Sequence, residues 1–407
     1  MALHTFDKKL LEFMYQLTLH QRLMTPREMA QTITIQGKKV SERTIKRWLK
    51  WLKTHHYFTY YPSIKYECLG LNGVGLILLG LKQTSILDTI PYKTYLMKGV
   101  DLKSHENCFF ANYRIPEGKF EEFCKFWKTA KNKGIVKDFF AFELKQIIAM
   151  YSPIHRIISP SGLLTTNTNL DNTNSLAFVK RKLETEHKSD MVPKIPFLTP
   201  IVMEHFKDYA SSKKIWHKIK GKFGDNVWHL VEKLPSDRRL KIRKQTDGVG
   251  IKCIQCTLKS LHQNFDTFFQ QMRFAYGPLY PKNINLHLAL ELKEPEKLMD
   301  LIEFLLNKSL YVVLYQTREN GIVILDVVTN NESVVKILSV ASDFSKKTKL
   351  NRTLLIDYGE SSNHWEDKTK GWLKQHYHEL FDPKTVSWKY DSEKYLNKLE
   401  QLSASGE

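Results

Sequence analysis

The clearest hydrophobic pattern in the chain lies between Ser41 and Lys53. Its apolar positions recur at the spacing of one helical face: Ile45, Trp48, Leu49 and Leu52. The opposite face carries mainly Lys and Arg, and Ser41 is a suitable N-cap. The segment therefore predicts a short amphipathic helix with a narrow buried stripe and a cationic outer face.

Comparable patterns flank this helix. Thr25–Glu28 has the sequence of a capping box with proline at the first helical position, and it predicts a helix that runs to about Ile33. An earlier apolar stripe from Leu10 to Thr18 predicts another helix. After the basic helix, Phe58–Pro62 and Ile64–Cys68 predict two short strands around a Pro-Ser turn. Residues 1–68 thus have the pattern of a winged helix-turn-helix.

Residues 69–151 alternate between strand and helix patterns in the order βαββαβ. Strands are predicted at Gly73–Leu81, Tyr92–Met97, Asn107–Tyr113 and Val136–Phe142. Between the last two, Glu117–Lys131 places its aromatic residues on one helical face. This order predicts a ferredoxin-like domain, with four antiparallel strands and two helices on one face.

The second half of the chain repeats the first weakly. Residues 152–196 are polar and predict a linker. Residues 197–260 suggest a degenerate winged-helix-like domain with its wing at Arg238–Leu258, and 261–360 a second ferredoxin-like domain before a tail at 361–407. The predicted fold class is α+β, an N-terminal winged helix-turn-helix followed by a ferredoxin-like βαββαβ domain, the pair weakly repeated in the C-terminal half.

The composition of the chain indicates which class of molecule it binds and where it is located. The 407 residues carry a net charge of +19, which favours a polyanion such as nucleic acid. The sequence contains neither an 18-residue apolar run nor a signal peptide at its N-terminus, and its five cysteines show no disulfide framework. These features predict a cytoplasmic protein.

A winged helix-turn-helix followed by a βαββαβ domain resembles the Lrp/AsnC class of prokaryotic transcription regulators. The residues that carry the resemblance are Thr25–Glu28, Ser41–Lys50, the predicted wing Phe58–Cys68, and Leu69–Phe142. The resemblance covers residues 1 to about 150 well and 197–360 as a weak second copy. It implies a nucleoid-associated regulator that dimerises through the βαββαβ domain.

Two departures from that class affect the expected partners. The chain is more than twice the usual length, which implies a tandem fusion that acts as a homodimer or as a pseudo-dimer within one chain. The segment Gly99–Glu106 is longer than the family's glycine-plus-acidic turn. A small-molecule effector is therefore an open expectation without assigned residues.

The expected partner is double-stranded DNA. Arg43, Arg47 and Lys50 would enter the major groove from the basic helix. Lys46 and the wing residues Tyr60, Ser63 and Lys65 would position the DNA phosphates, and Thr44 is a further expected DNA-binding residue. A second DNA-binding surface is possible at Lys213, Lys214 and Lys218. The alternative for such a helix is a solvated basic face without a partner.

Signs of catalysis are weak in the sequence. Cys253-Ile-Gln-Cys256 has no second Cys pair, and His376 and His378 are too close in sequence to converge on a helix. His287 lies on a predicted strand, where replication-initiator nucleases carry paired histidines, but it is single. We therefore expect no enzyme, no cofactor and no metal. The alternative functions are a replication-initiator nuclease, or RNA or single-strand binding by stacking on Phe109, Phe110 and Tyr113.

Overall fold

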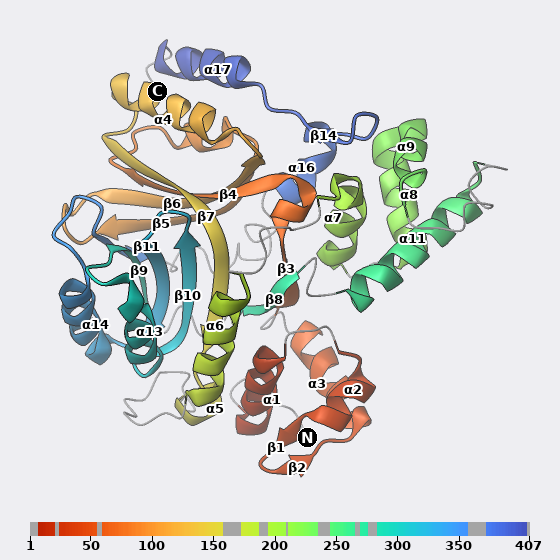
Figure 1. The fold of residues 1–407 in the computed structure, drawn as a ribbon, viewed down its shortest axis with the longest axis horizontal. Helices are drawn as coiled ribbons and strands as arrows, with labels where there is room; N and C mark the ends of the chain where they lie inside the picture. Colours follow the sequence, from red (N-terminus) through yellow and green to blue (C-terminus); the bar gives the residue numbers. More distant parts are fainter. Residues whose placement is uncertain are drawn as a thin grey trace.

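Eight antiparallel strands close into one barrel (Figure 1). The computed structural model describes residues 7–20, 24–54, 59–157, 172–186, 194–208, 211–234, 245–264, 269–275, 283–356 and 372–404. The first half of the chain contributes β4 (Leu71–Leu79), β5 (Lys93–Asp101), β6 (Asn107–Pro116) and β7 (Asp138–Tyr151). The second half contributes β9 (Ile284–Glu291), β10 (Ser309–Thr317), β11 (Ile322–Thr329) and β12 (Arg352–Ile356).

The predicted fold class is wrong, because the strands do not form two separate ferredoxin-like sheets. Around the barrel the order is β10-β11-β9-β12-β5-β6-β4-β7. The halves meet at two seams, where β12 pairs with β5 and β7 pairs with β10. An open four-stranded sheet exposes two edges with unpaired backbone groups, and closure pairs them all. Hydrophobic alternation predicts strands but not their partners across a seam.

Helices cover the outside of the barrel. In the first half, α4 (Phe120–Asn132) packs on the outward side chains of its strands, with Tyr113 against Phe123 at a ring-centroid distance of 5.1 Å. In the second half, α13 (Leu298–Leu306) and α14 (Asn331–Phe344) cover the outward leucines and valines, together with α6 (Thr173–Glu186). The interior is therefore lined by the other face of every strand.

Three helices precede the barrel: α1 (Lys8–Leu19), α2 (Pro26–Thr32) and α3 (Glu42–Thr54). The predicted capping box at Thr25 and Glu28 is confirmed. A short hairpin, β1 (Thr34–Ile35) and β2 (Lys38–Lys39), separates α2 from α3.

The predicted wing is wrong. β3 (Thr59–Ile64) pairs with β8 (Phe269–Ala275) from the other half of the chain. The segment expected as the second wing strand is instead the 3-10 turn η1 (Tyr66–Leu69). Local sequence cannot reveal a pairing partner more than 200 residues away.

A second group of helices comprises α7 (Thr199–Asp208), α8 (Ser212–Phe223), α9 (Val227–Val231) and α11 (Asp247–Gln263), with η3 (Pro196–Leu198) and η4 (Gly224–Asn226). A wing at Arg238–Leu258 is wrong where the structure describes it, since α11 is one continuous helix. Its buried residues follow helical spacing: Gly250, Cys253, Ile254, Thr257 and Leu261. Figure 1 places β3 and β8 between this group and α1–α3.

The C-terminal elements return to the first half of the barrel. They are α16 (Trp372–Leu380), β13 (Phe381–Asp382), β14 (Ser387–Trp388) and α17 (Ser392–Ala404). The Trp388 Nε1–H donates to the Leu69 carbonyl at 2.7 Å, and the Tyr92 hydroxyl donates to the Lys389 carbonyl. The remaining short turns are η2 (Thr84–Asp88), α5 (Ile154–Ile157) and η6 (Pro295–Lys297). Within the described ranges, none of the helices has the length and apolar character needed to cross a membrane.

Candidate functional site

The inward face of β9 carries a histidine in the middle of the barrel. Its outward residues, Leu286, Leu288 and Leu290, pack beneath α13 and α14. Because side chains alternate along a strand, His287 points to the interior. There its ring lies 4.0 Å from the Phe110 ring, which comes from β6 in the other half of the chain, and 5.8 Å from the Tyr315 ring (centroid distances).

His287 is fully buried and lacks hydrogen bonds. Its side chain is 0% exposed, and neither Nδ1 nor Nε2 has a hydrogen-bond partner among the described residues. Burial lowers the pKa of the imidazole to about 3, so the ring is neutral at pH 7. An unsatisfied buried polar atom opposes folding by about 1–3 kcal/mol. A group this costly in an apolar barrel is a candidate for function.

Buried carboxylates lie in the same row of inward-facing positions. Asp326 on β11 is directly opposite His287, and such pairs share one face of the sheet. On the other side Leu354 of β12 pairs with His287, and beyond it Leu354 pairs with Asp101 of β5. The row therefore runs Asp326, His287, Leu354, Asp101 across the β12–β5 seam.

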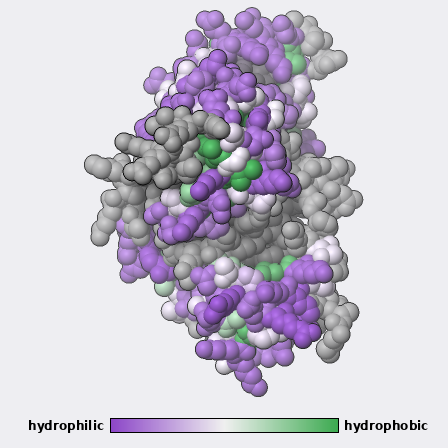
Figure 2. All heavy atoms as spheres, turned by 90° about the vertical axis from the view of Figure 1, so that its right-hand side faces the viewer, coloured by the Kyte–Doolittle hydropathy of each residue, from purple (hydrophilic) through white to green (hydrophobic). Residues whose placement is uncertain are grey.

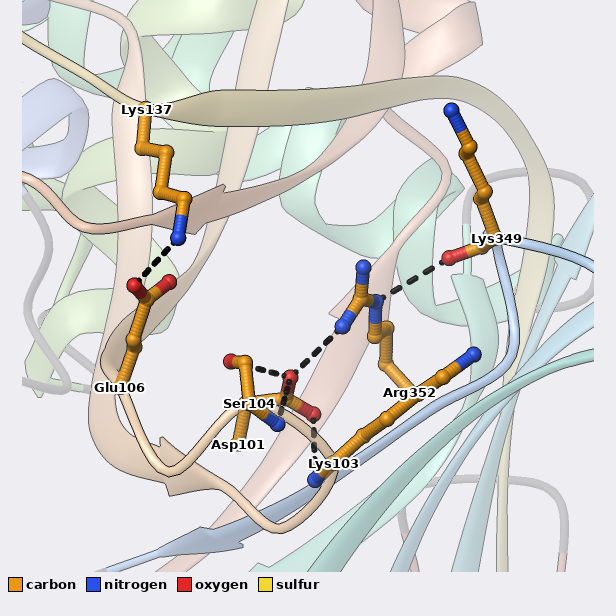
Figure 3. A network of polar contacts seen from close by, with 7 residues as sticks. All are labelled: Asp101, Lys103, Ser104, Glu106, Lys137, Lys349 and Arg352. Atoms are coloured by element: carbon orange, nitrogen blue, oxygen red, sulfur yellow. Dashed lines mark hydrogen bonds and ion pairs between the residues drawn. The ribbon is translucent and has the colours of Figure 1, made fainter.

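Asp101 is held in an ion pair at this seam (Figure 3). Its Oδ2 lies 2.8 Å from Arg352 Nη1, and the Asp101 and Arg352 side chains are 0% and 12% exposed. The same oxygen accepts from the Ser104 hydroxyl at 2.7 Å and from the Ser104 N–H at 3.1 Å. Arg352 also donates from Nε to the Lys349 carbonyl at 3.0 Å. The pair joins the two halves of the chain across the β12–β5 seam.

Further polar residues face the interior along β6. Asn112 is buried, and its Oδ1 has no hydrogen-bond partner in the described part of the chain. Arg114 lies two residues on, with its guanidinium 4.7 Å above the Tyr66 ring. A Cβ at Gly73 would lie 2.3 Å from Arg114 Nη1, so a larger residue at this position would displace the guanidinium. Burial raises the pKa of the neighbouring Glu67, and the charge of Arg114 opposes that rise.

The predicted DNA-binding residues lie away from the barrel interior. Arg43, Lys46, Arg47 and Lys50 are exposed on α3, where Lys46 pairs with Glu42 at 2.6 Å. Thr44 Oγ1 is 3.0 Å from Ser41 Oγ, and Lys65 directly precedes η1. The side chains of Tyr60 and Ser63 lie outside what the structure describes. The role of these residues in binding DNA stays a prediction.

The second basic surface is only partly assembled. Lys213 and Lys214 are exposed on α8, whereas Lys218 turns toward the buried Glu204, with 3.5 Å between Nζ and Oε2. Figure 2 shows the side on which Figure 1 places α8, α9 and α11, and its described residues are mainly hydrophilic with small, separate apolar areas. This face of the described residues presents no broad apolar surface.

Other sequence candidates do not form sites. Phe110 points into the barrel while Phe109 and Tyr113 pack on the outside, so the three rings make no stacking platform. His376 Nδ1 is 2.8 Å from Glu379 Oε1 on its own helix. Within the described ranges, no group of three or more His, Cys, Asp or Glu residues is arranged to hold a metal ion.

From the sequence, His287 was expected only as a possible nuclease residue, and Asp326 was not expected at the site. A signal was present, because each is the titratable residue in an otherwise apolar strand segment, Leu286–Leu290 and Ile322–Val328. What the sequence could not show is that these positions are opposite in register and face a closed interior.

Comparison with known proteins gives one weak structural likeness. No family model and no curated protein matches the chain. Two crystal structures of the siroheme decarboxylase NirDL are similar, the second in co-complex with an iron-uroporphyrin III analogue. The TM-scores are 0.39 and 0.38, each at 11% identity and over 99% of this chain, covering 99% and 100% of those chains. At this level no activity carries over.

The comparison nevertheless corrects the expected identity. Both structures are of an enzyme and not of a transcription regulator. The Lrp/AsnC-like assignment, the function of sequence-specific regulator with its nucleic-acid and nuclease alternatives, and the expectation of no enzyme are therefore wrong. We therefore infer the function from the residues that line the interior of this barrel.

Proposed function

We propose that the protein is an enzyme whose active site is the barrel interior, where His287 exchanges a proton with a small organic substrate. The observation that carries this proposal is the fully buried imidazole with no hydrogen bond from either nitrogen to the described residues. A neutral imidazole can accept a proton at one nitrogen while the other donates a hydrogen bond.

The surroundings favour a substrate with an apolar body and a polar group. Phe110 and Tyr315 present ring surfaces beside His287 and suit an apolar or aromatic part of the substrate. A hydrogen-bonding group on the substrate would satisfy the imidazole nitrogens and remove the cost of leaving them bare. An anionic group such as a carboxylate would also raise the pKa of His287 from its depressed value and so help the imidazole to hold a proton.

Asp326 has a supporting role in this proposal. It lies opposite His287 in register without a hydrogen bond to the imidazole, so its role would be to bind the substrate's polar group beside His287. The ion pair of Asp101 with Arg352 would fix the seam that forms the next part of the wall.

The test is a ligand screen against the wild type and two variants, His287→Leu and Asp326→Asn. The panel would contain small carboxylic acids and tetrapyrrole carboxylates, siroheme among them because the two similar structures concern a siroheme decarboxylase. We expect at least one compound to raise the thermal unfolding temperature of the wild type and to be chemically converted, with both effects lost in His287→Leu. Ligand-induced stabilisation that persists unchanged in His287→Leu would refute the role of His287.

Three expectations remain as proposals beside this function. The four exposed cations of α3 support duplex DNA as a partner of that helix, apart from any regulatory role. The closing of one barrel by both halves supports an intramolecular pseudo-dimer. A cytoplasmic location is also retained as a proposal.

A further inference from the structure

Two histidines from different helices meet in the second helical group. His205 lies on α7 and His262 on the last turn of α11, and their Nε2 atoms are 3.2 Å apart. The rings are tilted by 55° with centroids 5.4 Å apart. His205 is only 7% exposed, whereas His262 is open to solvent. The pair thus has one fixed, buried member and one member at the surface.

This geometry suits two ligands of one ion. Metal–nitrogen bonds of about 2.0–2.1 Å at a tetrahedral angle place two imidazole nitrogens about 3.3 Å apart. A hydrogen bond between the rings has a similar length but requires that one Nε2 carry the proton. An ion held between the two Nε2 atoms removes that requirement, because each nitrogen then binds the ion through its lone pair.

The neighbouring carboxylate does not join the pair. Glu204 precedes His205 but is engaged by Lys222 at 2.6 Å and by Lys218 at 3.5 Å. The Tyr377 hydroxyl also donates to Glu204, at 3.1 Å. Since the described residues bring no group of three His, Cys, Asp or Glu together, the remaining positions on an ion here would be taken by water.

We propose that His205 and His262 form a two-histidine site for a divalent first-row transition ion, with water completing the coordination. Imidazole nitrogens select Zn²⁺, Ni²⁺ or Cu²⁺ over Mg²⁺, which prefers oxygen ligands. An ion bound here connects α7 to α11 and stabilises their packing in proportion to its occupancy. The site is separate from the barrel interior and does not depend on the proposed function.

The test is calorimetric titration of the tag-free full chain with Zn²⁺, Ni²⁺, Cu²⁺ and Mg²⁺. We expect one site per chain for at least one of the first three ions, no heat with Mg²⁺, and loss of binding at pH 5.5, where protons compete for the imidazoles. His262→Ala should weaken that site by at least about tenfold.

Two control variants separate this site from other donors. His229→Ala removes an exposed histidine of α9, and Cys256→Ser an exposed thiol of α11; both should bind as the wild type does. Circular dichroism of His262→Ala, and titration of His262→Gln in parallel, would show that the loss is not one of folding. Equal affinity in the wild type and His262→Ala, or no site in the wild type, would overturn the proposal.

Discussion

Removing the guanidinium at the β12–β5 seam should destabilise the folded protein far more than removing a surface cation. In Arg352→Met, the 0% exposed carboxylate of Asp101 loses its counter-ion. Removing one partner of a buried ion pair costs about 3–5 kcal/mol. Ser104 still donates two hydrogen bonds to Asp101 Oδ2, which reduces the cost. We therefore expect the free energy of unfolding to fall by about 3 kcal/mol, at the lower end of that range.

The matched control is Lys137→Met in the same region (Figure 3). Lys137 pairs with Glu106 at 2.5 Å, but the two side chains are 66% and 31% exposed. An exposed pair of this kind contributes about 0–1 kcal/mol and is weakened by salt.

Urea unfolding followed by tryptophan fluorescence, with and without added salt, compares the two variants with the wild type. A loss in Arg352→Met no larger than that in Lys137→Met would refute the view that this buried pair holds the seam.

Three further predictions concern the interior and α3. Below pH 6.5 the unfolded chain protonates His287 while the folded barrel does not until about pH 3, so the free energy of unfolding should fall by about 1.4 kcal/mol per pH unit as pH drops through that window. Urea unfolding between pH 7 and 4.5 should therefore show a slope in the wild type that is steeper than that of His287→Leu by about this amount. Gly73→Ala places a methyl group 2.3 Å from Arg114 Nη1 and should displace that side chain, so we expect the free energy of unfolding to fall by about 1–3 kcal/mol in the same urea assay. Gly221→Ala is the control, because its methyl group would meet no atom within 4 Å and should not lower the free energy of unfolding. Arg47→Ala should weaken duplex DNA binding by about 1–3 kcal/mol if Arg47 contacts a base edge, which titration by fluorescence anisotropy would measure. Unchanged affinity would contradict the prediction that α3 binds duplex DNA.

Local patterns predicted the elements better than their assembly. The basic helix and the capped helix before it are present, because caps and 3.6-residue periodicity act within a few residues. The strands of both halves also lie close to where alternation predicted them. The barrel could not be predicted in this way, since its closure depends on pairs such as Leu354 with Asp101, which are about 250 residues apart.

The candidate site was hidden for the same reason. A single histidine in a predicted strand does not indicate a site by itself. The site becomes visible only in the structure, where the register pairs His287 with Asp326 and the fold packs Phe110 against its ring. The part of α11 up to Leu258 was predicted as a wing because Thr246–Gly248 resembles a hairpin turn. Here helical burial at Cys253, Ile254 and Leu261 outweighs the local turn preference.

The most direct test of the central claim is the stability of His287→Leu at pH 7.5, measured by urea unfolding beside the wild type. We propose that His287 acts on a substrate and does not stabilise the fold. Replacing it with an apolar side chain of similar volume removes two buried nitrogens without hydrogen-bond partners, so the substitution should not lower the free energy of unfolding. The account predicts that His287→Leu is at least as stable as the wild type. A loss of several kcal/mol, about 3 or more, would show that the imidazole holds the barrel together, and would contradict its assignment as the active-site group.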